Sequence, residues 1–253
     1  VFSGVKKSES EDLDEKINLV RGSQVTENII NNTKNIIKDY YIDKGFLNTQ
    51  IKVVQKEDSV YKNTVNVKIY VNKHDKIKVN DIIIEGNEVL SDGKIRRTMK
   101  NTKKKIWYNL FKRSKYIEED YEEDKKSILK KYSELGYRDA KITSDTVYAH
   151  DDKTVNIELN IEEGSKYYIR NISWVGNTKY TSEQLNKALR IRKGDVFNEE
   201  VIDKRLTMDQ DAVSNLYLDD GYLFFNVMPV EVKIEQDSID LEMRIFEGKQ
   251  ATI

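Results

Sequence analysis

A strict alternation of apolar and polar residues occurs three times along the chain. Its apolar members are Val65, Val67, Ile69 and Val71, then Val155, Ile157, Leu159 and Ile161, and finally Ile239, Leu241, Met243 and Ile245. A period of two predicts a β-strand in a sheet with one buried face and one solvated face. A polar turn, as at residues 150–153 and 236–238, comes just before the alternating run. We therefore expect each of these strands to form a hairpin with the strand that precedes it.

A helical pattern lies upstream of each hairpin. Apolar residues four apart predict a short helix in each case: Leu13 and Ile17, Ile95 and Met99, and Leu185 and Leu189. Ser91 and Thr181 are suitable N-caps for two of these helices.

A longer helix is predicted next, and it ends at a glycine in each copy. Its apolar face consists of Ile29, Thr33, Ile36, Ile37, Tyr40 and Tyr41; of Tyr121, Ile128, Leu129 and Tyr132; and of Ile202, Leu206, Val213 and Tyr217. The helix stops at a Tyr-x-x-x-Gly sequence whose glycines are Gly45, Gly136 and Gly221. Glycine suits this position because it has no Cβ to oppose the left-handed conformation that ends many helices.

These elements recur in the order β-α-α-β-β, so the predicted fold class is α+β with three tandem domains. Each domain is expected to be a three-stranded mixed sheet with two helices on one face, and the short joints favour an elongated array. The expected boundaries are 1–75, with a truncated first strand; 76–165, with an extended interhelical loop; 166–248; and 249–253, as the start of a following domain.

Composition agrees with several small domains and offers little for catalysis. Apolar residues make up 38% and charged residues 34% of the chain, which is thin for one deep core. The 43 basic and 44 acidic residues nearly cancel, so only local clusters of charge point to a partner. There is no cysteine, and His74 and His150 lie far apart without metal-ligand spacing. Phosphate-loop and dinucleotide motifs are missing, so we expect no enzyme, no metal and no cofactor.

Short motifs at constant positions carry a resemblance to a known family. They are the strand endings Ile84-Glu85-Gly86-Asn87 and Trp174-Val175-Gly176-Asn177, the Lys193-Gly194-Asp195 turn, the helix stops above, and Glu-Gly at 163–164 and 247–248. In this order they resemble the POTRA (polypeptide-transport-associated) domain over essentially the whole chain. The first copy departs from the pattern, because Val5 follows Gly4 where the other copies have asparagine.

The resemblance is greatest to the periplasmic part of BamA-like outer-membrane β-barrel assembly factors. It implies the middle three of five domains, in the periplasm of a Gram-negative cell, attached to a C-terminal membrane barrel outside this chain. The implied function is a scaffold that binds lipoproteins or other subunits of the assembly machine, together with unfolded outer-membrane protein clients. Two-partner secretion and translocation-assembly transporters also carry such domains and remain an alternative.

The second strand of each domain is the expected binding edge. Proline cannot donate to a strand ladder, so Pro229 predicts that its strand lies at an edge with the last strand in the middle. An exposed edge can accept an extended peptide by β-augmentation. The candidate strands are 48–55, 139–148 and 225–234, with Ile51, Val53, Ile142, Thr146, Val227, Val230, Val232 and Ile234 as candidate contacts. The alternative is that each edge is only an edge, kept monomeric by its charges and proline.

Residues 100–116, KNTKKKIWYNLFKRSKY, contain nine residues more than the corresponding segments of the other two copies. Insertions of this length are often functional. The candidate contacts are Lys103, Lys104, Lys105, Trp107, Tyr108, Phe111, Lys112 and Arg113. They could pack on their own or a neighbouring domain, or bind an acidic partner or a membrane headgroup. A nucleic-acid-binding module is the remote alternative. It is not the expected one, because the acidic run at residues 118–124 follows directly and would repel phosphate.

Overall fold

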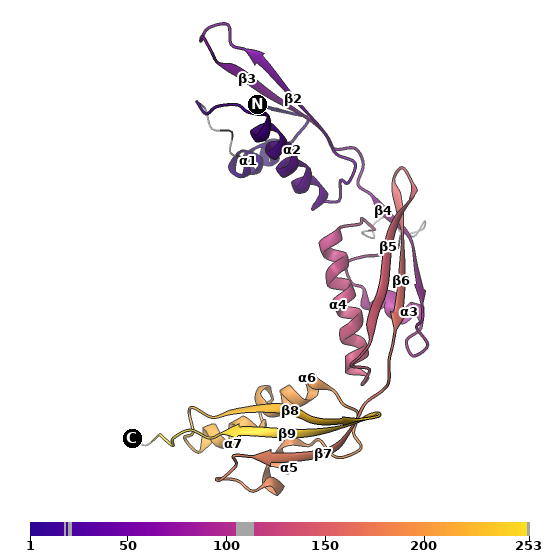
Figure 1. The fold of residues 1–253 in the computed structure, drawn as a ribbon, viewed down its shortest axis with the longest axis vertical. Helices are drawn as coiled ribbons and strands as arrows, with labels where there is room; N and C mark the ends of the chain where they lie inside the picture. The colour runs from indigo at the N-terminus through magenta and orange to yellow at the C-terminus, as the bar shows by residue number, and fades with distance from the viewer. Residues whose placement is uncertain (18, 20–21, 105–113, 252–253) are drawn as a thin grey trace. The chain divides into compact units, whose positions relative to one another are not determined.

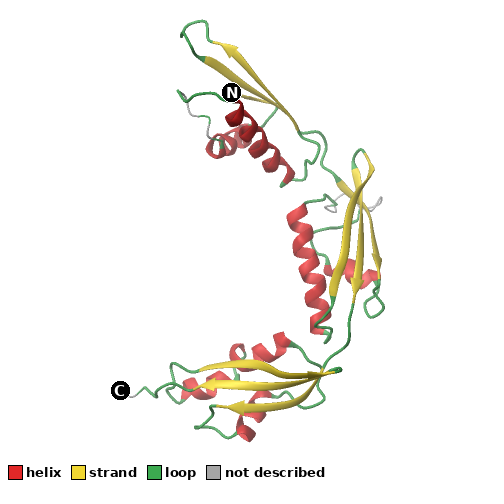
Figure 2. Cartoon of the chain, viewed as in Figure 1, coloured by secondary structure: helices red, strands yellow, loops and turns green. Residues whose placement is uncertain are grey.

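The computed structural model describes residues 1–17, 19, 22–104 and 114–251. Within these residues the chain forms three separate three-stranded sheets, each with its own helices (Figures 1 and 2). None of the described helices has both the length and the apolar character needed to cross a membrane.

The first repeat contains a short first strand and two helices. Its elements are β1 (Phe2–Ser3), α1 (Lys7–Lys16), α2 (Glu27–Ile42), β2 (Gln50–Glu57) and β3 (Val65–Asn72). The strand order is β1-β3-β2, with β1 parallel and β2 antiparallel to β3. Leu13, Ile37, Tyr41 and Ile69 form the centre of one hydrophobic core between the helices and the sheet.

The second repeat has the same order of elements and one long, unbroken second helix. Its elements are β4 (Lys78–Glu85), α3 (Asp92–Thr98), α4 (Glu118–Glu134), β5 (Lys141–Asp151) and β6 (Thr154–Glu162). The strand order is β4-β6-β5. Ile95 and Met99 in and after α3, and Ile128 and Tyr132 in α4, are fully buried, as the four-residue spacing predicts.

The third repeat differs in the region of its second helix. Its elements are β7 (Tyr168–Val175), α5 (Ser182–Leu189), α6 (Glu199–Asp203), the π-helix η1 (Lys204–Met208), α7 (Val213–Asp219), β8 (Asn226–Glu235) and β9 (Ser238–Phe246). The strand order is β7-β9-β8. Thr181 caps α5 as predicted, because its hydroxyl accepts from the Gln184 backbone N–H at 3.3 Å.

The predicted fold class, α+β with three β-α-α-β-β repeats, is confirmed, and the apolar pattern is largely correct. All eight alternating residues of β6 and β9 are buried, whereas Val65 in β3 is 39% exposed. The hairpin of the first repeat therefore extends beyond its core. In the first turns of α2 it is Ile30 that is buried and not the predicted Ile29, so the buried face of this helix is rotated slightly from the predicted one. The elongated array stays a prediction.

The single long helix predicted for the third repeat is wrong. The Asp209 N–H bonds the Lys204 carbonyl at 2.9 Å, five residues back, which is the π-helical pattern. The chain then leaves the helix until Val213. Arg205 stabilises the break, because its guanidinium donates to Asp209 and Asp211 and to carbonyls at the end of α5.

The glycine that ends the first strand is required for close packing within each sheet. Gly86 and Gly176 have φ values of 78° and 88°. A Cβ added at Gly86 would lie 2.1 Å from the Ile161 carbonyl oxygen, and one at Gly176 would lie 2.2 Å from that of Ile245. Only glycine allows the backbone both this conformation and this approach.

A tyrosine and a carboxylate join the long-helix region to the turn after the first strand. Tyr132 donates to Glu163 at 2.7 Å, and Tyr217 donates to Glu247 at 3.2 Å. Glu163 also accepts from the Val89 N–H, so each carboxylate holds a helix, a strand end and a turn together.

In the first repeat a basic residue stands where the second and third repeats have this glutamate, and the carboxylate comes from a helix. Lys73, two residues after the last alternating position, stands where the other repeats have glutamate. The carboxylate comes instead from Glu9 of α1, which accepts from Lys73 at 3.0 Å and from Tyr41 at 3.3 Å. Burial alone would raise the pKa of Glu9, but the Lys6 N–H and Lys73 hold it below its usual value.

Candidate functional site

The second strand of each sheet lies at an edge, and the last strand lies in the middle. This order is found in all three sheets, as β1-β3-β2, β4-β6-β5 and β7-β9-β8. It agrees with the position predicted for the strand that contains Pro229. The eight candidate edge residues lie on three separate sheets, so they form three edges and not one combined site.

The edge of β8 is interrupted. Pro229 lies opposite Met243, and the register shifts between Glu231 and Lys233, which marks a bulge at Val232. Val232 and Ile234 are 48% and 49% exposed. The same strand buries Val227 toward the helices and half-buries Val230. A proline and a bulge are two of the features by which proteins prevent strands from adding to an edge.

The edge of β2 is regular by comparison. Its eight residues pair with β3 in one continuous register, from Gln50 opposite Asn72 to Glu57 opposite Val65. Ile51 and Val53 are half-buried against the core of the first repeat, so their backbone is held in place. β5 is longer, with eleven residues; its Ile142 is half-buried and its Thr146 exposed.

The basic insertion begins and ends at the outer edge of β4. Val79 forms a parallel bridge with Lys104, and its N–H donates to the Ser114 carbonyl at 2.7 Å. The Tyr116 N–H donates to the Ile77 carbonyl at 2.9 Å. The two flanks of the insertion therefore cover the first part of this edge.

The described lysines of the insertion are held within their own repeat. Lys103 donates to the Met99 carbonyl, and Lys104 forms an ion pair with Asp81 of β4 at 2.8 Å. Asp124, which is buried in α4, fixes the preceding segment by accepting backbone N–H bonds from Lys100 and its two successors. The other candidates, Lys105, Trp107, Tyr108, Phe111, Lys112 and Arg113, lie outside the described residues.

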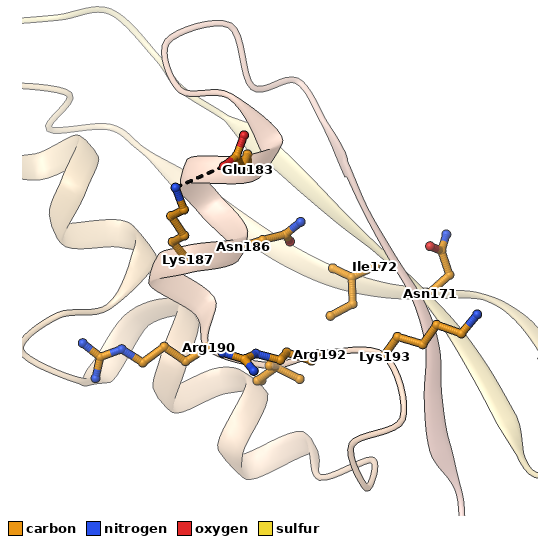
Figure 3. Close-up of a pocket in the computed structure, with 9 residues that line it drawn as sticks. Asn171, Ile172, Glu183, Asn186, Lys187, Arg190, Arg192 and Lys193 are labelled. Atoms are coloured by element: carbon orange, nitrogen blue, oxygen red, sulfur yellow. Dashed lines mark ion pairs between the residues drawn. The ribbon is translucent and has the colours of Figure 1, made fainter.

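A basic hollow in the third repeat was missed by the sequence analysis. It has a volume of about 480 Å³ and lies between β7 and α5 (Figure 3). Asn171 and Ile172 of β7, Asn186 and Lys187 of α5, and the loop 190–193 line it. Four basic residues between 187 and 193 were the available signal in the sequence.

The described chain offers no arrangement suited to metal chemistry. No group of three or more histidine, aspartate or glutamate side chains is placed to hold a metal ion in the part that the structure describes. The shifted pKa values belong mostly to tyrosines and ion pairs of the fold. Burial and Asp220, for example, raise the pKa of Tyr180 to about 12.

Comparison with known proteins gives three matches to one family and a set of distant relatives. Residues 1–74, 77–164 and 167–248 match POTRA, described as a surface antigen variable number repeat. The outer membrane protein assembly factor BamA of Neisseria meningitidis serogroup B is 25% identical over 240 residues, which are 93% of this chain and 29% of that protein. BamA of Buchnera aphidicola is 28% identical over 189 residues, 74% of this chain and 30% of that protein.

A crystal structure of Haemophilus influenzae BamA POTRA3-5 is similar with a TM-score of 0.47 and 20% identity, over 97% of this chain and 93% of that one. The chain spans less than a third of the length of the two curated relatives.

Proposed function

The chain belongs to the POTRA family, and from this membership we propose that it is the periplasmic region of an outer-membrane protein assembly factor. In this proposal it is a non-catalytic scaffold that binds other subunits or lipoproteins of the assembly machine and unfolded outer-membrane proteins. It delivers these clients to a membrane barrel that is not part of this sequence. The observation that carries the proposal is the match of three consecutive POTRA repeats, in a chain whose relatives are named as assembly factors.

Strand addition at sheet edges is the proposed mode of binding. Backbone hydrogen bonds attract an extended chain without requiring one sequence, which suits a scaffold with many clients. Segments of outer-membrane barrels alternate apolar and polar residues, so they can present one apolar face to a sheet.

We rank β2 and β5 above β8 as client edges. β2 pairs in one continuous register, so its outer backbone groups run as a straight ladder. β5 offers the longest of the three edges. β8 carries Pro229 and the bulge at Val232, both of which oppose strand addition.

Photo-crosslinking in cells tests this function. A photoreactive amino acid at Gln55 of β2 or Thr146 of β5 should capture outer-membrane proteins or lipoproteins. The same amino acid at Val232 should capture less, because the edge is bulged there. Lys68 is the control, since it is exposed but lies on β3, the middle strand. Capture at Lys68 equal to that at Gln55 and Thr146, or no capture at either edge, would refute the proposal.

The basic insertion is retained as a second contact, with a partner or with phosphate headgroups. Lys103 and Lys104 are engaged within their own repeat, so the test should center on Lys105 and Trp107. Replacement of both by alanine should weaken binding to anionic vesicles or to lipoprotein partners. Unchanged binding to both would remove this contact from the proposal.

A further inference from the structure

We propose that the basic hollow beside β7 binds an acidic segment of an extended polypeptide. A carboxylate of that segment takes the place that Asp81 occupies in the second repeat. The inference rests on the proposed function only in that it requires extended client or partner chains. It concerns the first strand of the third repeat, which is the edge opposite to the second-strand edges considered above.

Equivalent positions in the second and third repeats show what the hollow lacks. Residues 78–85 and 168–175 occupy the same place in their sheets, which aligns Asp81 with Asn171. In the second repeat, Asp81 pairs with Lys104 of the interhelical loop at 2.8 Å. In the third repeat the strand offers only a neutral amide at this position.

The interhelical loops of the two repeats also correspond. The Val79 N–H donates to the Ser114 carbonyl at 2.7 Å in the second repeat, and the Ile169 N–H donates to the Asp195 carbonyl at 2.8 Å in the third. The loop of the third repeat therefore matches the second flank of the insertion, with Asp195 in the place of Ser114 and Val196 in the place of Lys115. Lys104 pairs in the parallel direction and has no backbone counterpart in the third repeat. The positive charge beside β7 comes instead from Arg192 and Lys193, and the strand has no carboxylate at the position of Asp81.

The other charges around the hollow leave an excess of positive charge. Lys187 pairs with Glu183 at 3.1 Å across an exposed helix surface, as Figure 3 shows. Arg190 pairs with Asp211 at 2.5 Å and points away from the strand. Four basic side chains line the hollow with one acidic side chain, Glu183.

Two further carboxylates lie near the loop, and both have partners of their own. Asp240 forms an ion pair with Arg170 at 2.8 Å, although Lys193 also lowers the pKa of Asp240 through space. Asp195 accepts the Arg192 backbone N–H at 2.8 Å. Neither occupies the position that Asp81 has in the second repeat.

The occupant is a polypeptide because the hollow runs beside a sheet edge. The loop pairs with Ile169 at the start of β7, through Asp195 and Gly194, and covers that part of the edge. The hollow begins just after it, at Asn171 and Ile172. The register of β7 shifts between Ile169 and Asn171, so an extended chain can pair with the regular part of the strand from Asn171 onward and place a carboxylate over the cations. A lipid headgroup would make no use of the strand.

The test uses the whole chain and a pair of fluorescein-labelled ten-residue peptides. Both peptides alternate valine and threonine; one carries two aspartates and the other carries asparagine at the same positions. Fluorescence anisotropy at low salt should show the aspartate peptide binding about tenfold more tightly, and this preference should fall as salt is raised. Amide NMR signals of Asn171 and Gly194 should shift on binding.

Variants decide whether the hollow is responsible. Asn171→Asp supplies the missing carboxylate internally, so the preference for the acidic peptide should fall below about twofold. Arg192→Glu with Lys193→Glu should have the same effect. The matched control is Lys94→Glu with Lys126→Glu, two exposed lysines of the second repeat, and it should leave the preference unchanged. Circular dichroism must show the same fold for all variants.

Several results would overturn the proposal. These are equal binding of the two peptides, an unchanged preference in the Asn171→Asp variant, NMR shifts elsewhere, or binding of phosphatidylglycerol vesicles without binding of the peptide. Such results would leave capture at β2 and β5 in cells unaffected, so failure here is distinguishable from failure of the proposed function.

Discussion

Replacing Glu247 by glutamine should destabilise the third repeat by about 2 kcal/mol. Glu247 follows β9 and accepts from the backbone N–H groups of Thr178 and Lys179 at 2.7 and 2.8 Å. It also accepts from the Thr178 hydroxyl and, at 3.2 Å, from the hydroxyl of the fully buried Tyr217. One carboxylate thus joins the turn after β7, helix α7 and the end of β9.

The magnitude follows from these four contacts. A hydrogen bond to a charged group contributes about 1.5–3 kcal/mol to the free energy of unfolding when its donor is shielded from water. The Thr178 and Lys179 donors lie at an exposed turn and can bond water instead. Glutamine keeps one acceptor oxygen but turns an N–H2 group toward donors. The net loss is therefore about 2 kcal/mol, carried mainly by the Tyr217 hydroxyl and by weakening of the remaining bonds.

Tryptophan fluorescence can follow this repeat alone. The chain has two tryptophans, and a Trp107→Phe background leaves Trp174, which is 9% exposed and lies in the hydrophobic core of the third repeat. For a domain of this size the urea dependence is about 1 kcal/mol per M, so the midpoint should fall by about 2 M. The matched control is Glu242→Gln on the same strand, whose partner is the exposed Arg244. Its midpoint should move by less than about 0.5 M.

The pH dependence provides an independent check. Burial alone would raise the pKa of Glu247, but donation from the Lys179 and Thr178 N–H groups holds it below its ordinary value. A lowered pKa contributes stability above the ordinary value, and this stability is lost as the pH falls through the folded value. The difference between wild type and Glu247→Gln should therefore shrink between roughly pH 5 and pH 3. A midpoint shift no larger than that of Glu242→Gln, or a difference independent of pH, would refute the reasoning.

Three further predictions concern other parts of the fold. Gly176→Ala should lower the free energy of unfolding of the third repeat by at least about 2 kcal/mol more than Gly194→Ala, since both glycines have φ near 90° but a Cβ at Gly176 would lie 2.2 Å from a backbone oxygen. The same urea titration measures the difference, and equal losses for the two variants would contradict the steric argument. Lys73→Glu places a second carboxylate beside Glu9 and should destabilise the first repeat by about 2 kcal/mol, measured by hydrogen exchange of α2. Adding Glu9→Gln to this variant should restore at least half of the lost stability, and no recovery would show that the two charges do not interact. Arg205→Met should destabilise the third repeat by about 2 kcal/mol and speed hydrogen exchange in α6 and α7, because the Arg205 side chain is 12% exposed and bonds two carboxylates and two carbonyls. Unchanged hydrogen exchange would mean that the π-helical break does not depend on Arg205.

Local patterns in the sequence determined the elements and their order. The alternating residues of β6 and β9 are buried because a strand exposes its two faces in turn, whatever it packs against. Gly136 and Gly221 mark helix ends because a left-handed residue is a local requirement. Pro229 located an edge strand by the same kind of argument, since a missing N–H is a property of the residue itself.

The tertiary structure decided which charges meet and which edges are usable. The sequence could not show that Glu9 replaces a glutamate missing from the end of β3, because Lys73 lies 64 positions away. The bulge at Val232 depends on the register with β9. The hollow beside β7 depends on a loop and a strand that meet only in the fold, and on comparing Asn171 with Asp81 in its place. Pairings between distant residues have no period along the chain, so only the three-dimensional structure reveals them.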